Sequence, residues 1–371
     1  MALVTDWLIG VGGAERVVVE IHKLFPEAPI YTSQADRRRL ELLKDADIRT
    51  GWLQRLPLSW RKFMPVLRAW YFSRLDLSGY DLVISISGAE AKFVKTKRRV
   101  ESGEWRGAVH VSYCHSPTHY YWRRYREYLA QPGFGWLDPL ARLGLRLLVG
   151  PLRGWDYKAA QRPDYFIANS SHIQAEIKKY YGRQAEVIHP PVDVERFKKR
   201  GVESGERRGF LVVGRQIPYK RIDLAVAACT KLELPLTVIG DGPEHAKLHK
   251  LAGQTVKLLG NLPDAEVPGY FQQAEALILP TNVEDFGVTG VEALAAGTPV
   301  IAYHAGGPLD YIEPSQTGLF FEAQSVDSLV KALQKFQGLK FDHAQIAKRA
   351  EAFSATTFRQ KIADFIKSKA R

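Results

Sequence analysis

Short apolar runs alternate with longer stretches of helical periodicity along almost the whole chain. The runs are apolar at successive positions, which is typical of parallel strands that are covered by helices on both faces. This alternation predicts an α/β protein with two doubly wound parallel sheets in tandem and ligand residues at the strand tips of both, so a cleft between the domains is expected. The expected strands cover residues 3–7, 81–87, 109–114, 164–168, 209–213, 236–239, 256–259, 276–280 and 300–303.

The chain has 371 residues, which is enough for two domains. Residues 198–208 hold Lys, Arg, Gly, Ser and Glu with few apolar positions, so we expect the interdomain linker there. The predicted organisation is a first Rossmann-like domain at 1–197, a second at 209–355, and a C-terminal helix within 356–371.

Residues 276–303 predict a strand, an acidic loop, a helix from Val288 to Ala296 and a further strand. The positive end of a helix suits a phosphate, and Gly287 lets a ligand approach the backbone. Glu284 and Glu292 could accept hydrogen bonds from hydroxyl pairs of a hexose and a ribose. The alternative is that Glu284 caps the helix and Glu292 is a solvated helix residue.

Two cations follow the strand expected at 209–213. Arg215 offers a planar fork of donors at the strand end, and Lys220 offers a compact charge on the next loop. Together they could neutralise a diphosphate leaving group, whose charge grows as a glycosidic bond breaks. Both could also be solvated loop cations.

Two features of the first half are candidate ligand contacts. His115 follows the strand at 109–114, and ligands of open α/β sheets bind at the carboxyl ends of strands. Gly12 and Gly13 belong to a glycine-rich turn into a helix that continues through Leu24. The spacing of these glycines does not fit a dinucleotide fingerprint, and a tight turn without a ligand is the alternative.

The formal net charge of +12 is unevenly distributed. Residues 1–200 hold 33 Lys and Arg against 21 Asp and Glu, whereas residues 201–371 hold 19 of each kind. Residues 53–75 and 119–156 mix cations with aromatic and aliphatic residues, and Gly and Pro interrupt both. They are either helices packed on the sheet or elements that settle on anionic lipid; a lipid diphosphate and nucleic acid are the other anionic candidates.

Other features narrow the class of protein. No apolar run approaches the roughly 20 residues that cross a bilayer, and the early acid Asp6 does not fit a signal peptide. Cys114 and Cys229 are far apart in sequence, which fits a reducing cytoplasm. Since no Cys/His cluster has zinc spacing, we expect no structural metal.

The segments Glu-Asp-Phe-Gly at 284–287 and Glu-Ala-Leu-Ala-Ala-Gly-Thr-Pro-Val-Ile-Ala at 292–302 resemble the retaining glycosyltransferases of family GT4. Residues 109–117, 164–193 and 209–321 support the resemblance, which implies a GT-B fold. The segments at 113–118, 214–224 and 284–287 are most similar to bacterial O-antigen and polysaccharide mannosyltransferases. The resemblance therefore implies hexose transfer from a nucleotide-diphosphate sugar, with GDP-mannose favoured.

The family pattern also implies residue roles. In GT-B folds the terminal helix often crosses back onto the first domain, and GT4 enzymes usually react by front-face attack. We expect no metal and no cofactor besides the donor substrate. The implied contacts are Glu292 with the ribose, Arg215 and Lys220 with the diphosphate, Glu284 with the hexose, the backbone of Phe286, Gly287 and Val288 with sugar and phosphate, Leu262 with the base, Gly12 and Gly13 with the diphosphate, and His115 with the sugar.

Two segments beside the sugar depart from the family pattern, namely Thr281-Asn282-Val283 and Val288-Thr289-Gly290. A UDP- or TDP-sugar is therefore the alternative donor. A sugar-nucleotide epimerase or hydrolase and a non-enzymatic basic anion-binding protein are the alternative functions. With the transferase interpretation we expect a lipid-linked or glycan acceptor, a position at the cytoplasmic face of an anionic membrane, and no nucleic-acid partner.

Overall fold

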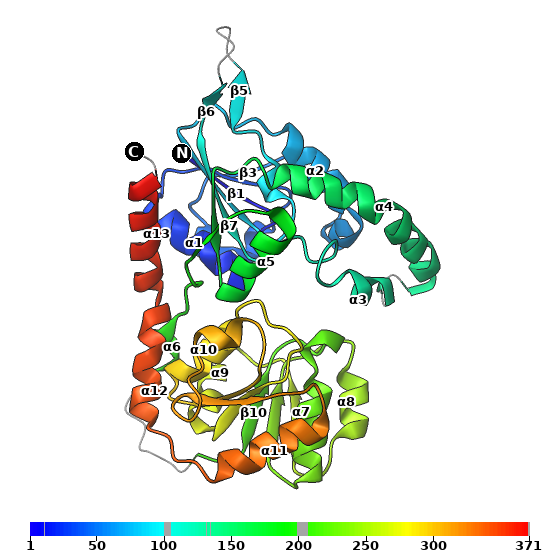
Figure 1. Ribbon diagram of the computed structural model, residues 1–371, viewed down its shortest axis with the longest axis vertical. Coiled ribbons are helices and arrows are strands. Elements are labelled where there is room, and N and C mark those ends of the chain that lie inside the picture. Colours follow the sequence, from blue (N-terminus) through cyan, green and yellow to red (C-terminus); the bar gives the residue numbers. More distant parts are fainter. Residues whose placement is uncertain (11, 100–104, 131, 134, 199–206, 370–371) are drawn as a thin grey trace. The chain divides into compact units, whose positions relative to one another are not determined.

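The computed structural model describes residues 1–10, 12–99, 105–130, 132–133, 135–198 and 207–369. The chain forms two units: unit 1 comprises Met1–His189 together with the C-terminal residues from Arg359, and unit 2 comprises Pro190–Phe358 (Figure 1). The division falls a few residues before the expected end of the first domain at residue 197. Most of the expected linker, residues 199–206, lies outside the described residues.

Unit 1 is built on a sheet of seven parallel strands in the order β3-β2-β1-β4-β7-β8-β9. Strand β1 lies between β2 and β4, and its register with β4 pairs Ala2 with Val83 and Thr5 with Ile86. The strands are β1 Ala2–Thr5, β2 Ile30–Thr32, β3 Ile48–Thr50, β4 Leu82–Ser87, β7 Val109–Cys114, β8 Tyr165–Ala168 and β9 Glu186–Val187, and a separate antiparallel hairpin joins β5 Lys97–Arg99 to β6 Trp105–Gly107.

Unit 2 repeats this plan with six parallel strands in the order β12-β11-β10-β13-β14-β15. In both units the chain winds outward from one central strand and then returns to its other side. The loops that follow these two neighbouring strands, β1 and β4 or β10 and β13, therefore meet at the carboxyl edge, which we call the reversal point. The strands of unit 2 are β10 Phe210–Val213, β11 Leu236–Ile239, β12 Val256–Gly260, β13 Ala276–Leu279, β14 Val300–Tyr303 and β15 Gly318–Phe321.

Helices cover both faces of the unit 2 sheet. Successive strand residues point to opposite faces, so each strand contributes to two buried clusters. Leu211, Leu277 and Val300 pack in one buried cluster with residues of α6, α9, α10 and α12. Val212 and Ile278 pack in a second cluster with residues of α7, α8 and α11. The helices are α6 Val194–Phe197, α7 Ile222–Lys231, α8 His245–Leu251, α9 Val267–Gln273, α10 Val288–Ala295, α11 Val326–Gln337 and α12 His343–Ala350, with short 3₁₀ turns η7 Pro218–Lys220, η8 Gly307–Asp310 and η9 Glu351–Phe353.

The last helix, α13, contributes its later part to unit 1. Arg359 forms an ion pair with the nearly buried Glu20, and the rings of Phe365 and Tyr165 meet edge to face at 6.3 Å. The helices of unit 1 are α1 Gly13–Leu24, α2 Pro65–Arg74, α3 Tyr125–Ala130, α4 Asp138–Ala159 and α5 Ser171–Tyr181, α13 spans Ala355–Lys369, and the 3₁₀ turns are η1 Arg37–Arg39, η2 Glu41–Leu43, η3 Trp52–Arg55, η4 Leu58–Phe63, η5 Ala91–Phe93 and η6 Gly135–Leu137.

Proline breaks the helical structure in one of the two basic regions of unit 1 but not in the other. Residues 52–74 form two 3₁₀ turns followed by α2, as the prolines at 57 and 65 predict. In the second region, the expectation that Gly and Pro interrupt the chain is wrong for residues 138–159. Helix α4 runs through Gly144, Gly150 and Pro151 without a break.

Buried contacts near its carboxyl end explain why α4 persists. Asp156 is fully buried and accepts hydrogen bonds from Trp122 Nε1 at 2.7 Å and from the Tyr181 hydroxyl at 2.8 Å. The ammonium of Lys92, also buried, lies 2.7 Å from the same carboxylate. These contacts fix the end of the helix. Pro151 has no N–H to donate to the carbonyl of Leu147, and both residues are exposed.

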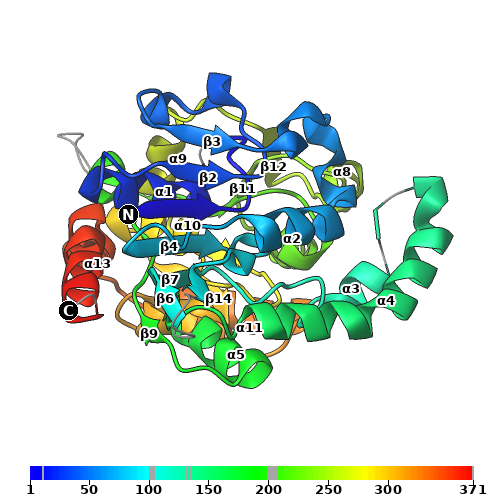
Figure 2. The ribbon, with the colours of Figure 1, turned by 90° about the horizontal axis from the view of Figure 1, so that it is seen from above.

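Helix α4 and the neighbouring α3 extend from the rest of unit 1 (Figure 2). Within the described residues, no helix is both long enough and apolar enough to cross a membrane.

Candidate functional site

The reversal point of unit 2 brings together two of the residues that the sequence singled out. Lys220 ends the 3₁₀ turn after β10, and Glu284 lies on the loop after β13. The Lys220 ammonium is 2.7 Å from Glu284 Oε2, although the two residues are 64 positions apart. Because both side chains keep some exposure, at 24% and 16%, the pair is accessible to a ligand.

Backbone contacts hold the Glu284 loop at both sides. The Asn282 N–H donates to the carbonyl of Tyr219 at 3.2 Å, which ties this loop to the loop that carries Lys220. The Gly307 N–H donates to the carbonyl of Glu284 at 2.9 Å, which ties it to the segment after β14. Two other segments of the chain therefore fix the backbone of the loop that carries the carboxylate.

Gly287 turns the chain from this loop into α10. Its φ of 86° lies in the left-handed region that side chains disfavour. The buried Tyr311 donates its hydroxyl to the Gly287 carbonyl at 3.1 Å. A Cβ at Gly290 would lie 2.2 Å from that hydroxyl, so only glycine fits there beside Tyr311. Burial, with a contribution from Glu284, raises the pKa of Tyr311 well above its ordinary value, which keeps the hydroxyl protonated as a donor.

Other predicted donor residues lie on the same edge or next to it. Arg215 follows β10 and is exposed, and Glu292 lies half-buried on α10. Phe286 is buried and packs against Tyr311 at 5.5 Å, so its backbone rather than its ring remains for a ligand, while Val288 begins α10. The side chain of Leu262 likewise packs against the core.

The predicted contacts of unit 1 lie at the carboxyl edge of its own sheet. His115 follows β7, donates its N–H to the Ser87 carbonyl at 2.9 Å and accepts from Asn169 at 3.0 Å. Its ring stays partly exposed. Gly12 and Gly13 are exposed at the start of α1, which ends at Leu24 as predicted. The Gly12 N–H donates to the Glu15 carboxylate at 3.1 Å.

The sequence did not single out the polar groups at the reversal point of unit 1. The Asp6 carboxylate accepts backbone N–H groups from all four residues of 88–91, at 2.6–3.1 Å. Beside it, Arg68 and Glu90 form a buried ion pair at 2.9 Å, and Tyr120 donates to Glu90. Burial raises the pKa of Glu90 even though Arg68 opposes the shift. An early acid directly after the first strand was the available signal.

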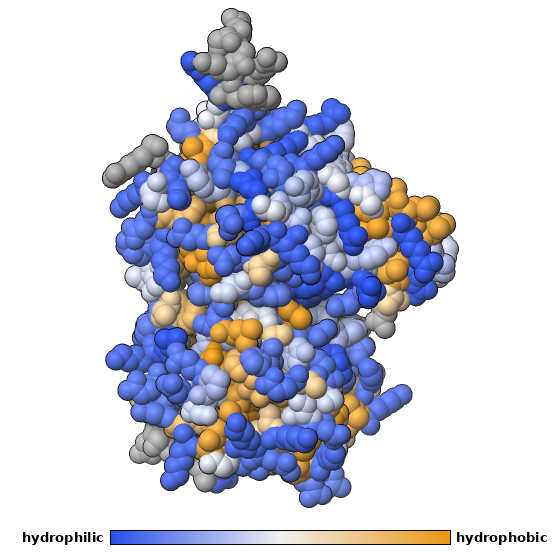
Figure 3. Space-filling view, viewed as in Figure 1, coloured by the Kyte–Doolittle hydropathy of each residue, from blue (hydrophilic) through white to orange (hydrophobic). Residues whose placement is uncertain are grey.

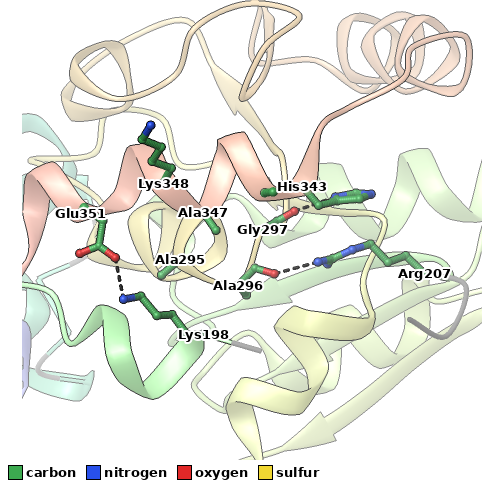
Figure 4. Close-up of a pocket in the computed structure, with 10 residues that line it drawn as sticks. Lys198, Arg207, Ala295, Ala296, Gly297, His343, Ala347, Lys348 and Glu351 are labelled. Atoms are coloured by element: carbon green, nitrogen blue, oxygen red, sulfur yellow. Dashed lines mark hydrogen bonds and ion pairs between the residues drawn. The ribbon is translucent and has the colours of Figure 1, made fainter. Parts of the chain in front are cut away.

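A pocket of unit 2 lies at the opposite end of α10, next to Ala296 and Gly297 (Figure 4). Arg207 donates to the Ala296 carbonyl at 2.7 Å, and Lys198 lies 2.7 Å from Glu351. None of the predicted donor residues lines it, so we do not assign the donor to this pocket. The described part of the chain holds no group of three or more His, Cys, Asp or Glu that could bind a metal ion.

Two family models match the chain in succession. The model of Glycosyltransferase Family 4 matches residues 11–196, and the model of Glycosyl transferases group 1 matches residues 193–353. A curated relative is the GDP-mannose-dependent alpha-(1-6)-phosphatidylinositol monomannoside mannosyltransferase of Mycobacterium tuberculosis, which is 28% identical over 44% of this chain and 50% of that protein. The match thus spans about half the length of such relatives.

Similar solved structures extend over the whole chain. The lipopolysaccharide outer core galactosyltransferase WaaB has a TM-score of 0.69 at 20% identity, with 100% of both chains covered. The Anabaena protein HepE in complex with UDP-glucose has a TM-score of 0.66 at 20% identity, with 99% of both chains covered. With two Rossmann-like units of the GT-B kind and a family model that covers half of its residues, the chain belongs to glycosyltransferase family 4.

Proposed function

We propose that the protein transfers a hexose from a nucleotide-diphosphate sugar to an acceptor hydroxyl. The observation that carries the proposal is the Lys220–Glu284 pair at 2.7 Å beside the start of α10. It places a cation for phosphate, a carboxylate for sugar hydroxyls and a helix N-terminus at one edge of one sheet. These three elements suit the transfer of a sugar that leaves a diphosphate behind.

Each donor group then has a partner in unit 2. Lys220 and Arg215 take the diphosphate, and Glu292 takes the ribose hydroxyls. Glu284 takes hydroxyls of the hexose, while the backbone of residues 286–288 supports the sugar and the adjoining phosphate, and the backbone at Leu262 takes the base. From unit 1, we assign His115 to the sugar, and Gly12 and Gly13 to the diphosphate, on the family pattern.

We propose retention of configuration by front-face attack. The bond between the anomeric carbon and the phosphate oxygen breaks, and its electron pair stays on the phosphate. The acceptor oxygen bonds to the same face of the carbon, and its proton passes to the departing phosphate. Lys220 and Arg215 can supply the positive charge that this leaving group needs, so we propose that no metal is required.

The favoured donor is GDP-mannose, and the favoured acceptor is lipid-linked or a glycan at the cytoplasmic face of a membrane. The name of the matched mannosyltransferase of Mycobacterium tuberculosis supports GDP-mannose as the donor and a lipid-linked acceptor. The name of the HepE complex with UDP-glucose supports a UDP-sugar as the competing donor. The excess of 33 cations over 21 acids in residues 1–200 supports an anionic surface as a partner.

A thermal-shift panel tests the donor. GDP, UDP, ADP and TDP and their common sugars are added to the protein with a chelator present, and ligands that bind the folded state raise its melting temperature. We expect a shift with GDP and GDP-mannose. A shift with UDP- or TDP-sugars alone would replace the sugar and keep the class of enzyme, and no shift with any nucleotide would overturn the proposal.

Product analysis tests the reaction. Incubation with GDP-mannose and membrane lipid extract should yield a mannosylated product, and the anomeric NMR signal of the new bond should match the configuration of the donor. Donor consumption at the same rate without acceptor would instead indicate a hydrolase or an epimerase.

A further inference from the structure

Helix α4 carries an apolar stripe that the described residues of unit 1 leave uncovered. Leu140, Leu143 and Leu147 recur at spacings of three and four, which places them on one face of the helix. Trp136 lies four residues before Leu140, just ahead of the helix. The exposed fractions are 67%, 52% and 68% for the three leucines in chain order and 88% for Trp136. Apolar residues gather over this part of unit 1 in Figure 3. Four large apolar side chains in one row exceed the scattered exposure that is ordinary for a surface.

Contacts on the other side of the helix hold α4 in an orientation that keeps the stripe exposed. Arg153 donates to the Tyr121 carbonyl at 2.7 Å and lies over the rings of Trp122 and Tyr125. Asp156 is buried in the contacts described above. Rotation of α4 to hide the leucines would break these contacts and leave a buried carboxylate without partners, which is costly. The exposure of the stripe is therefore a property of the folded unit.

An exposed cation, Arg146, borders the stripe between Leu143 and Leu147. Arg142 lies on the same side of the helix as Arg153, three turns away. Arg142 also donates to the Ala130 carbonyl at 3.1 Å, which connects the end of α3 to α4. An apolar face with a tryptophan at one end and an arginine at its border is the pattern of a helix that lies in a membrane interface.

Other occupants fit less well. A symmetric contact between two copies through this stripe would bring the arginines of both helices together, and like charges repel. A membrane-spanning arrangement would place Asp138, Arg142, Arg146 and Arg153 in hydrocarbon. An anionic bilayer accepts both the leucines and the arginines.

We propose that α4 is the membrane anchor of this protein and lies in the plane of an anionic bilayer, with Trp136, Leu140, Leu143 and Leu147 inserted. The inference rests on the proposed function, because a lipid-linked acceptor requires the enzyme at a membrane. It goes further by assigning the insertion to one helix face and the electrostatic attraction to Arg146 beside it.

Vesicle binding of matched double variants tests the anchor. The test variant is Leu140→Ser/Leu147→Ser, and the control is Leu42→Ser/Leu251→Ser, whose leucines are also exposed, at 60% and 39%, but lie outside α4. We expect the test variant to lose roughly 25-fold in binding to phosphatidylglycerol vesicles, if each leucine contributes roughly fivefold on burial. We expect the control to bind like wild type. Equal binding by the test variant and wild type, or equal loss in the control, would overturn the proposal.

The charge part has its own readout. Arg146→Glu should weaken binding to anionic vesicles and remove much of its salt dependence. Wild-type binding that is equal for neutral phosphatidylcholine and anionic vesicles, or no binding to either, would overturn the inference. A wild-type dimer in sedimentation velocity that Leu140→Ser/Leu147→Ser abolishes would assign the stripe to a second copy instead.

A site-specific probe tests insertion directly. The native cysteines Cys114 and Cys229 are buried, so Leu143→Cys offers one accessible thiol for an environment-sensitive fluorophore. We expect a blue shift with anionic vesicles at position 143 and none for Leu42→Cys labelled in the same way. The thermal shift with GDP is measured on every variant, since a normal shift without vesicle binding refutes the anchor alone, whereas vesicle binding without any nucleotide shift refutes the transferase.

Discussion

The sheets of the two units share one order over six strands, to which unit 1 adds β9, but the units use their reversal points in opposite ways. In unit 1 the loops after β1 and β4 meet around Asp6, whose carboxylate accepts the backbone N–H groups of 88–91. In unit 2 the corresponding loops present Lys220 and Glu284, which remain partly exposed. Topology thus provides a place where loops converge, and the residues on those loops decide whether it is filled from within or left for a ligand.

Charge and tryptophan content follow the same division. The excess of positive charge lies in residues 1–200, and all eight tryptophans lie within residues 1–189. Unit 2 holds the charged residues that we assign to the donor, namely Arg215, Lys220, Glu284 and Glu292. We therefore expect substitutions in unit 2 to act on donor chemistry and those on the surface of unit 1 to act on location. Tryptophan fluorescence reports on unit 1, which allows the two to be followed separately.

The largest expected effect is on the proposed chemistry. Lys220→Ala removes a cation from the leaving group, so turnover should fall by about 10²–10³-fold, as when one preorganised charge donor is removed. The measurement is the steady-state rate with saturating donor, and an unchanged far-UV circular dichroism spectrum is the control. Near-normal turnover would contradict the assignment of the donor site to unit 2.

In the same assay, Glu292→Ala should abolish transfer through loss of the ribose contact, while the circular dichroism spectrum stays unchanged.

A packing change in unit 2 should cost stability without disturbing unit 1. Gly290→Ala places a Cβ 2.2 Å from the buried Tyr311 hydroxyl, and such overpacking typically costs about 1–3 kcal/mol. We expect a lower midpoint in urea unfolding followed by circular dichroism, with the fluorescence transition of unit 1 unchanged. Tyr311→Phe in the same chain should restore part of the loss, because it removes the nearest atom. No recovery in the double variant would show that the ring itself prevents the fit.

Acid should destabilise unit 1 through His110. This side chain is fully buried on β7, and burial lowers its pKa to about 3 from an ordinary value of 6.5. Between these two values the unfolded chain binds more protons than the folded chain. The contribution of neutral His110 to the free energy of unfolding is therefore complete above pH 6.5 and is lost as the pH falls toward the folded pKa. The free energy of unfolding then changes by up to about 1.4 kcal/mol per pH unit.

Urea unfolding followed by tryptophan fluorescence at pH 6.5 and 5 measures this slope. In His110→Gln the difference between the two pH values should shrink, since glutamine can keep a hydrogen bond to Ser85 Oγ without titrating. An equal pH dependence in wild type and variant would assign the acid sensitivity to other groups.

The smallest effect concerns the ion pair at the reversal point of unit 2. Glu284 lies 2.7 Å from the ammonium that we assign to the diphosphate, so its charge competes with the product. Glu284→Gln should bind free GDP several-fold more tightly, by about 1 kcal/mol, while it uses the sugar donor less well. Titration calorimetry with GDP measures the gain. Weaker GDP binding would mean that Glu284 orients Lys220 instead of opposing the phosphate.

The sequence predicts the local parts of this molecule well. The strand at 276–279, the helix from Val288 and the broken region at 52–74 follow from apolar runs, Gly287 and the prolines, all of which act within a few residues. The carboxyl ends of parallel strands then bring Lys220 to Glu284. The model of Glycosyl transferases group 1 covers the segments at 284–302, and together with the family 4 match over residues 11–196 it confirms the family resemblance.

What the sequence did not predict depends on contacts between distant residues. Helix α4 continues past Pro151 because Asp156 meets Lys92, Trp122 and Tyr181, which come from three other segments. Tyr311 supports Gly287 from 24 positions away through a single hydroxyl. No local pattern marks such pairs, because burial is decided only when the whole unit packs.

The contribution of α13 to unit 1 has a consequence for how the protein is made. A ribosome synthesises all of unit 2 before it reaches Arg359, which at ordinary elongation rates takes roughly ten to thirty seconds. During that interval Glu20 and Tyr165 lack their partners on α13. Unit 1, which is begun first, is thus completed last. A truncation or fusion at the carboxyl end should impair folding of the unit 1 sheet while unit 2 still forms.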